Sequence, residues 1–463
     1  MSVSNEKMKQ WCRQLLDPAE YPQPVLLDYL AEIPALESLA DVPAGTPVLV
    51  RGDVDAKPGP SVGEQDIRLR SMLPTLQYGR DRGWKQIVFG HVGRRPDETL
   101  AKVAARLSEL LHCDVPLVGD WLDESSVTVG DAVRKQIETA EPGAVIVLEN
   151  TRRYSIETAL WKAQASDLER LAPPLARLAN EMADKVAQVY VNEAFSAGSL
   201  DVSSAVVPAA MDRVALGSYV REQFAGPMTE CLGAQLVVFS GLKIDKLDDL
   251  AAIMRRGSVR LVISAGSLAM ALKAAAARIE GSSFSLGLAG DAENKGKPFY
   301  IPPQRIEQAQ GIIQEGRKNG VEFALPVDFV LQDGRVAETI GPGDQQFDVG
   351  PQTSRLFEQK VDEFIRRFAE SADGPAVAFH NGVFGMFEDP RFEEGTHRFI
   401  AQLKRLTDAG VSVYVGGGEG GAALEKYGQP DWVTHCFTAG GTVLAALGEQ
   451  PIPYLVALRM AAS

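Results

Sequence analysis

Short apolar segments alternate with amphipathic helical patterns along almost the whole chain. The apolar segments are rich in β-branched residues and nearly continuous, which is typical of strands buried on both faces of a parallel sheet. The expected strands are Pro47–Arg51, Gln86–Gly90, Val145–Glu149, Val189–Asn192, Gln235–Phe239, Val259–Ser264, Glu322–Pro326, Ala376–His380 and Val411–Gly416. Helical patterns lie between them, including Ser71–Arg82, Leu100–His112, Leu247–Arg255, Ser267–Ile279 and Gln304–Asn319. This order predicts an α/β protein whose ligands bind at the carboxyl ends of parallel strands.

Composition sets limits on the class of protein. The 463 residues, 45% of them hydrophobic, are enough for two or three domain cores. A net charge of −14 argues against a general nucleic-acid or anionic-membrane binder. The four cysteines have no CxxC spacing, so we expect reduced thiols rather than disulfides or a zinc site. With no apolar run near ~18 residues and no signal-peptide pattern, we expect a cytoplasmic protein that makes no membrane contact.

A glycine-rich turn stands out at Val411–Gly428, where a β-branched run leads through GGGEGG into an alanine-rich helix. Glycines let backbone N–H groups approach a phosphate, and the following helix N-terminus favours negative charge. The carboxylate of Glu419 fits such a cradle if Mg²⁺ bridges it to the phosphate oxygens. The alternative interpretation is a tight connection with no ligand. The pattern indicates a nucleotide-phosphate site.

The two halves of the chain differ in the chemistry of their strand ends. The first half carries cations after several strands: Arg51, Arg68, His91, Arg94, Arg95, Arg152 and Arg153. A single arginine there is usually a surface group, but cations from several strand ends favour a convergent anion site. The second half carries glycines together with Lys243, Asn381, Glu388 and Glu419. We therefore expect two Rossmann-like lobes, one for an anionic substrate and one for a nucleotide.

The expected boundaries follow this division. They are an N-terminal extension at 1–45, an acid-substrate lobe at 46–206, an interdomain helix or hinge at 207–234, a nucleotide lobe at 235–445, and a tail at 446–463 that returns to the first lobe. The extension includes an expected helix, Glu6–Leu16. No GxxxxGK[ST], HExxH or GxSxG motif is present, which excludes a P-loop and two common hydrolase signatures.

Eleven segments in order resemble the phosphoglycerate kinase family. They are RGDVDA, IRLR, GHVGRRP, LENTRRY, YVNEAF, SGLKIDK, LPVDFV, FDVGPQT, HNGVFGMFE, GGGEG and TAGGT, from about Val48 to Val456. The resemblance implies a two-lobed kinase that moves phosphoryl between ATP·Mg²⁺ and a carboxylate, forming or consuming an acyl phosphate.

The same resemblance assigns site residues. Asp53, Asp55, Arg68, His91, Arg94 and Arg152 match acid-binding positions, and Arg68 matches the arginine that bridges the carboxylate and the migrating phosphoryl. Nucleotide positions are Ser240, Gly241, Lys243, Lys246, Gly266, Asn381, Glu388, Gly417, Gly418, Glu419 and Gly420, with Glu419 as the metal ligand. Gly440 and Gly441 match the helix N-terminus that meets the transferring phosphate, so Arg68, Lys243, Gly440 and Gly441 are the expected catalytic positions. The Lys243–Lys246 loop is one residue shorter than the family pattern, which leaves the placement of Lys246 open.

The departures from the family pattern lie in the ligand loops. The family's AFGTAHRAH is AFSAGSLDV here, so its arginine is Leu200 and its first histidine is Ser199. The DFN asparagine is Asp55, and GGGDT becomes GGGEG at Glu419 and Gly420. Other departures are Ser240 and Ala439 for glycines, His380 for a tryptophan and Val383 for a proline.

We therefore expect a divergent, monomeric carboxylate kinase. Loss of one arginine and gain of Asp55 make the acid cleft less positive by two charges. The acid is 3-phosphoglycerate or a related phosphorylated, phosphonylated, amino or less anionic acid of specialised metabolism. Arg95 or Arg153 are candidates to replace the missing cation. Two other functions stay open: an acyl-phosphate-dependent amide ligase and a nucleotide-binding regulator.

Overall fold

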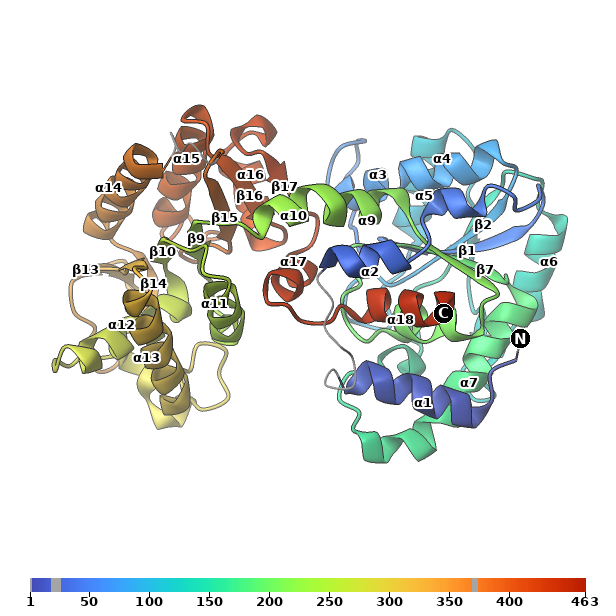
Figure 1. The fold of residues 1–463 in the computed structure, drawn as a ribbon, viewed down its shortest axis with the longest axis horizontal. Coiled ribbons are helices and arrows are strands. Elements are labelled where there is room, and N and C mark those ends of the chain that lie inside the picture. Colours follow the sequence, from blue (N-terminus) through green and yellow to red (C-terminus); the bar gives the residue numbers. More distant parts are fainter. Residues whose placement is uncertain (1, 18–25, 369–373) are drawn as a thin grey trace. The chain divides into compact units, whose positions relative to one another are not determined.

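The chain is divided into two compact units in the computed structural model, which describes residues 2–17, 26–368 and 374–463 (Figure 1). Unit 1 consists of residues 1–226 and 449–463, and unit 2 consists of residues 227–448. The chain therefore passes between the units twice, at Gly226–Pro227 and at Gly448–Glu449. Each unit contains its own six-stranded sheet.

Unit 1 contains a fully parallel sheet in the order β3-β6-β2-β1-β7-β8. These strands are β1 (Pro47–Gly52), β2 (Lys85–Phe89), β3 (Leu117–Val118), β6 (Val145–Leu148), β7 (Val189–Glu193) and β8 (Arg213–Leu216). Alternate residues of β1, Val48 and Val50, pack in one core cluster with Leu76 and Leu107. Leu76 belongs to α4 (Leu73–Asp81) and Leu107 to α5 (Ala101–Leu111). Because β1 lies between β2 and β7, the strand order changes direction there, and a crevice at such a point is where ligands bind.

Unit 2 repeats this plan with the order β11-β10-β9-β15-β16-β17, again fully parallel. The strands are β9 (Leu236–Phe239), β10 (Leu261–Ser264), β11 (Glu322–Ala324), β15 (Val377–Asn381), β16 (Ser412–Gly416) and β17 (His435–Cys436). Val238 of β9 packs in one core cluster with Phe357 of α14 (Pro351–Phe368) and Phe399 of α15 (Glu394–Asp408). The other helices of the sheet layers are α11 (Lys246–Arg255), α12 (Gly266–Ile279), α13 (Pro303–Lys318) and α16 (Glu419–Tyr427). In this sheet the strand order changes direction at β9, which lies between β10 and β15.

The expected elements agree with the structure within a few residues at their ends, and helix α1 (Asn5–Leu16) forms as expected. The prediction of parallel α/β sheets is confirmed. The segment 207–234, expected to hold an interdomain helix or hinge, contains both a strand and a helix. Strand β8 occupies Arg213–Leu216, and the helix begins only at Ser218 with α9 (Ser218–Gln223). It continues through a π-helical turn, Phe224–Met228, into α10 (Thr229–Cys231).

Some short strands had no recognisable pattern. They include an antiparallel sheet of β12 (Phe329–Leu331), β13 (Val336–Ala337) and β14 (Gln346–Val349), and a two-stranded pair of β4 (Leu122–Asp123) and β5 (Thr128–Val129). Two to four residues are too few for a periodicity of two to be visible in the sequence. Within the described ranges, no helix is long and apolar enough to cross a membrane.

The C-terminal helix α18 (Pro453–Ala462) packs in unit 1, although the chain reaches it from unit 2. In Figure 1 this red helix lies beside the blue helix α2 (Leu26–Glu32). Tyr454, Leu455, Val456, Ala457 and Leu458 are all buried. The hydroxyl of Tyr454 donates to the carbonyl of Phe195, which follows β7. The last residues of the chain thus support a loop at the strand ends of unit 1.

We predict that Leu458→Ala lowers the free energy of unfolding of unit 1 by about 2–5 kcal/mol, because it empties a buried site. Denaturant unfolding followed by circular dichroism would measure this loss. Met460→Ala, at a half-buried position of the same helix, is the matched control and should cost clearly less. Equal effects of the two substitutions would contradict the packing of α18 in the core of unit 1.

Candidate active site

Asp53 and Asp55 follow β1 in unit 1 and position Arg68. Asp53 is buried and accepts hydrogen bonds from the Ser196 hydroxyl at 2.6 Å and from the Ser196 amide at 3.2 Å. Burial raises the pKa of Asp53, and the Arg68 charge opposes that shift. Arg68 lies in α3 (Ile67–Ser71), with its Nε 3.8 Å from Asp53 Oδ1 and its Nη1 3.1 Å from Asp55 Oδ2. The structure therefore brings these three sequence-predicted residues together.

A second cluster surrounds Asp201, on the loop after β7. Its carboxylate lies 3.7 Å from Arg51 Nη2, 3.9 Å from Arg152 Nη2 and 3.4 Å from His91 Nδ1. Arg51 Nη2 is also 3.0 Å from His91 Nδ1. Burial first, and then the arginines, hold the pKa of His91 well below its usual range, so the imidazole is neutral at pH 7.

Trp161, Glu157 and Asp201 were not identified from the sequence. The indole Nε1 of Trp161 donates to Asp201 Oδ1 at 2.9 Å, and the Arg152 guanidinium lies over the Trp161 ring at 4.9 Å. Glu157 is buried, and burial together with Asp201 raises its pKa to about 7. Among the described residues, His91, Glu157 and Asp201 form the one group placed closely enough to hold a metal ion. Arg51 and Arg152 oppose a cation there, so we assign this cluster to charge compensation.

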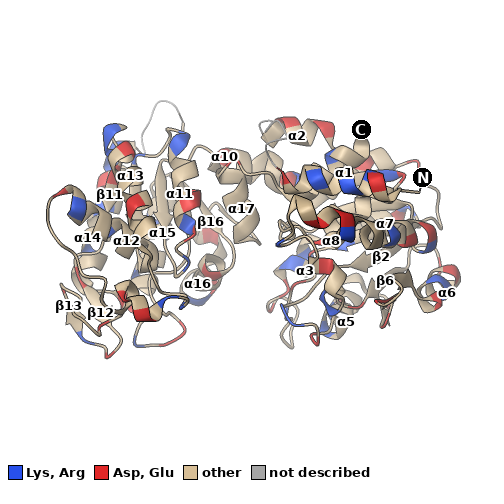
Figure 2. Ribbon diagram, turned by 90° about the horizontal axis from the view of Figure 1, so that it is seen from below, with Lys and Arg blue, Asp and Glu red and all other residues tan. Residues whose placement is uncertain are grey.

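The other predicted cations of unit 1 lie farther out. Arg94 is exposed on the loop after β2. Arg95 pairs with Asp97 at 3.6 Å, and Arg153 pairs with Glu149 at 3.6 Å. Both candidate replacements for the missing arginine therefore have carboxylate partners. Basic and acidic positions are both spread over the helices of each unit (Figure 2).

Glycines let the loops of unit 2 approach one another at the carboxyl ends of β9, β10 and β15. A Cβ on Gly382 would lie 2.2 Å from the Ser240 carbonyl oxygen, and one on Gly266 would lie 2.8 Å from the Gly241 carbonyl oxygen. Gly241, Gly266 and Gly382 all have positive φ, which disfavours other residues. The three loops thus meet only because side chains are absent.

Two further glycines, Gly417 and Gly440, let the loop after β16 approach the segment that leads into the next helix. A Cβ on Gly417 would lie 2.4 Å from the Phe437 carbonyl oxygen, and one on Gly440 would lie 3.2 Å from the Gly417 carbonyl oxygen. The side-chain nitrogen of Asn381 is near both Gly416 and Gly440. Gly440 and Gly441 begin α17 (Gly440–Leu447), so its unpaired N–H groups belong to the same cluster. A Cβ on Gly441 would meet open space.

Lys246 is the lysine held inside this cluster. Its Nζ donates to the Ser240 carbonyl oxygen at 2.6 Å, and it also borders the positions of Gly241 and Gly382. Burial lowers the pKa of Lys246, while the Glu419 charge opposes that shift. Lys243 is exposed at the start of the same short loop. Despite the missing residue in this loop, Lys246 faces the glycines.

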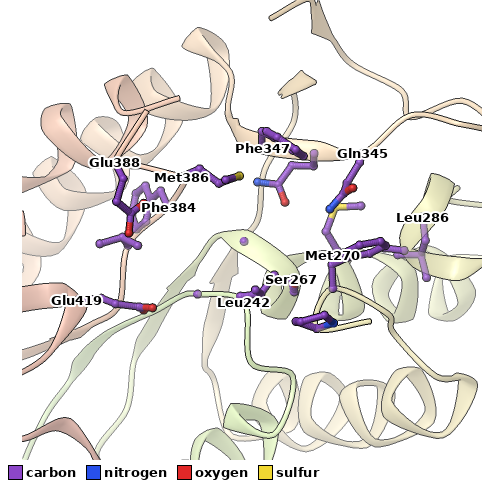
Figure 3. Close-up of a pocket in the computed structure, with 18 residues that line it drawn as sticks. Leu242, Ser267, Met270, Leu286, Gln345, Phe347, Phe384, Met386, Glu388 and Glu419 are labelled. Carbon is purple, nitrogen blue, oxygen red and sulfur yellow. The ribbon is translucent and has the colours of Figure 1, made fainter. Parts of the chain in front are cut away.

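A pocket of 370 Å³ lies beside these loops (Figure 3). Its lining includes Gly241, Gly266, Glu388 and Glu419, together with apolar residues such as Met270 and Phe347. The side chains of Glu388 and Glu419 lie at one end of the pocket, and Gln345 and Leu286 lie at the other (Figure 3). An apolar pocket with polar groups at one end suits a base and its phosphates.

The donors fit a nucleotide with Mg²⁺. The backbone N–H groups of the glycine-rich loops and the ammonium of Lys246 can bind phosphate oxygens. The Glu419 carboxylate can bind a hard cation whose other ligands are phosphates and waters. Gly418 is the N-cap residue of α16, with φ +70°. Gly420 is buried in that helix, and a Cβ there would lie 3.3 Å from Val415 Cγ1 and 3.8 Å from His380 Nδ1. His380 and Gly420, two departures from the family pattern, therefore adjoin each other in the core.

Comparison with known proteins gives one family. A family model described as phosphoglycerate kinase matches residues 39–450. A phosphoglycerate kinase of Bifidobacterium longum (strain DJO10A) is 30% identical over 451 residues, with 91% of this chain and 99% of that protein covered. A cytosolic phosphoglycerate kinase of Triticum aestivum is 28% identical over 411 residues, with coverage of 85% and 90%. The crystal structure of the enzyme from Pyrococcus horikoshii OT3 has a TM-score of 0.70 at 23% identity, with coverage of 93% and 99%, which supports the fold.

We predict that Gly382→Ala weakens nucleotide binding, because its Cβ would collide with the Ser240 carbonyl at a φ of +100°. The strain should be about 1–3 kcal/mol and should displace the loops. Calorimetric titration with ADP measures the effect. The control is Gly311→Ala in α13, where a Cβ would meet open space. Unchanged ADP affinity in a folded Gly382→Ala protein would show that this loop does not shape the site.

Glu419→Gln should weaken binding of Mg·ADP by about tenfold or more while leaving metal-free ADP nearly unaffected, because an anionic ligand for a hard cation is lost. Glu425→Gln, at an exposed position of the same helix, controls for the change of net charge. Equal losses with and without Mg²⁺ would mean that Glu419 contributes only to structure.

Proposed function

This chain belongs to the phosphoglycerate kinase family, and from that premise we propose that it transfers phosphoryl between ATP and a carboxylate. Its cofactors are those of the family, ATP or ADP with Mg²⁺. The observation that carries the proposal is the convergence, in unit 2, of glycine loops, Lys246 and Glu419 beside one pocket. A base-sized apolar pocket ending at phosphate donors is the arrangement that a nucleotide kinase needs.

In the proposed reaction, a carboxylate oxygen of the acid forms a bond to the γ-phosphorus of ATP. The bond from that phosphorus to the β,γ-bridging oxygen breaks, and ADP leaves. An ionised carboxylate has no proton to lose, so the reaction requires no general base. Such transfer depends on positioning and on stabilisation of spreading negative charge.

We assign the roles of the residues from the family resemblance, and the contacts of the side chains support this assignment. Arg68, held by Asp53 and Asp55, orients the carboxylate and meets the migrating group. Lys246 and Lys243 contact phosphate oxygens, together with the N–H groups of Gly440 and Gly441 at the start of α17. Glu419 would hold Mg²⁺, which supplies electrostatic stabilisation of the phosphates when bound.

The identity of the acid is a separate question. The candidates are 3-phosphoglycerate and a related, less anionic acid, and the protein is expected to act in the cytosol as a monomer. Two alternatives use the same fold: an amide ligase that passes the acyl phosphate to an amine, and a nucleotide-binding regulator. The regulator would be favoured if Gly420, Ser240 and the shortened Lys243–Lys246 loop prevented productive binding of Mg·ATP.

Release of ADP from Mg·ATP with a panel of small carboxylic acids, with and without amines, distinguishes these functions. ADP release without an amine supports the kinase. Release only with an amine supports the ligase, and nucleotide binding without any release supports the regulator.

We predict that Arg68→Ala lowers turnover by about 100-fold or more, because one preorganised cation is lost from the transition state. Affinity for ADP should be unchanged, since Arg68 lies in unit 1. Steady-state rates and calorimetry provide the two measurements. Arg134→Ala, at an exposed ion pair with Glu138, is the control. Normal turnover with reduced ADP affinity would reject the role of Arg68.

A further inference from the structure

The carboxylate of Asp201 lies among the arginines of unit 1. Its side chain is 1% exposed and faces Arg51 and Arg152 at 3.7 and 3.9 Å. In the family motif quoted above, alanine occupies this position. A fixed negative charge is therefore part of the protein at this point.

Asp201 is held by more than these ion pairs. Its Oδ1 accepts the indole hydrogen bond of Trp161, and its backbone carbonyl accepts from the amides of Ser204 and Ala205 at 3.1 and 2.8 Å. Those amides belong to the first turn of α8 (Val202–Ala205). Because the main chain and the side chain are both fixed, a ligand cannot displace the carboxylate without breaking buried contacts.

The neighbouring charges are compensated as well. Arg68 faces Asp53 and Asp55, while Arg51 and Arg152 face Asp201. His91 is neutral at pH 7, because burial and the arginines hold its pKa far below its usual range. Arg94 is the predicted acid-site cation to which the described residues offer no ion pair, and it is exposed. The cluster therefore has little positive charge left for a phosphate group.

We propose that Asp201 is an internal counterion that excludes phosphorylated acids, so that the substrate is a carboxylic acid without a phosphate group. This rests on the proposed carboxylate kinase function and specifies its substrate class. A phosphate dianion beside Asp201 would meet a buried like charge, whose repulsion is strong at low dielectric. The single carboxylate of the substrate acid pairs with Arg68. The ring of Trp161, 44% exposed at the edge of the cluster, offers apolar contact to the rest of the acid.

The first test uses the wild-type protein with Mg·ADP and compares calorimetric affinities for glycerate and 3-phosphoglycerate. We expect 3-phosphoglycerate to bind no more tightly than glycerate, or not at all. Affinity for 3-phosphoglycerate at least tenfold higher than for glycerate would overturn the proposal.

The second test is Asp201→Asn, which keeps the shape and removes the charge. Affinity for 3-phosphoglycerate should rise about tenfold or more, because the negative charge that repels a phosphate group is removed. Asp348→Asn is the matched control, since Asp348 is a buried carboxylate of unit 2 that accepts from the amides of Val349 and Gly395. It should leave this affinity unchanged. An Asp201→Asn protein that folds and gains nothing would refute the counterion role.

If Asp201→Asn does not fold, Leu200→Arg supplies the answer. Leu200 is half-buried and adjacent to Asp201 in the chain, so an arginine there offsets the carboxylate without leaving buried arginines unpaired. Affinity for 3-phosphoglycerate should again rise, and a folded variant with unchanged affinity would contradict the proposal.

These binding measurements separate the two proposals. Failure of every acid to release ADP, with the expected gain in Asp201→Asn, would refute the kinase but keep the counterion. Rapid turnover of tightly bound 3-phosphoglycerate by the wild type would support the kinase but refute the counterion role of Asp201.

Discussion

Each unit depends on a central strand whose neighbours are reached in opposite directions along the sheet. In unit 1 this strand is β1, between β2 and β7, and in unit 2 it is β9, between β10 and β15. In open α/β sheets, ligands bind at the carboxyl ends of the strands where the strand order changes direction in this way. Asp53 and Ser196 meet at one such edge, and Ser240 and Gly382 meet at the other. The chemistry of both clusters is thus a consequence of strand order.

The groups at the two strand-end clusters differ in their electrostatics. In unit 2, backbone groups and Lys246 provide positive potential in a place where bulky side chains are excluded. In unit 1, arginines are abundant, but carboxylates face them at distances of 3.1 to 3.9 Å. A count of cations along the sequence therefore overstates the attraction that unit 1 has for anions.

The fold was largely accessible from the sequence, because buried parallel strands produce long β-branched runs. Glycine spacing likewise indicated the cluster around Gly417 and Gly440, since close backbone approach demands glycine. Two features were not accessible. The edge strand β8 was not recognised within the segment expected to hold the interdomain helix or hinge, because a four-residue run carries little periodicity. The role of Asp201 depends on partners 40 to 150 residues away, which no local pattern can reveal.

The double crossing between the units has a consequence for synthesis on the ribosome. Unit 2 is one continuous stretch, residues 227–448, so it can complete its core as soon as those residues have emerged. Unit 1 is begun first but needs α18, which is made only after unit 2, to fill its core. Domains generally fold in the order in which they are made. Here the core of unit 1 stays incomplete until α18 has emerged, so unit 1 is the unit that most needs protection while unit 2 is being made.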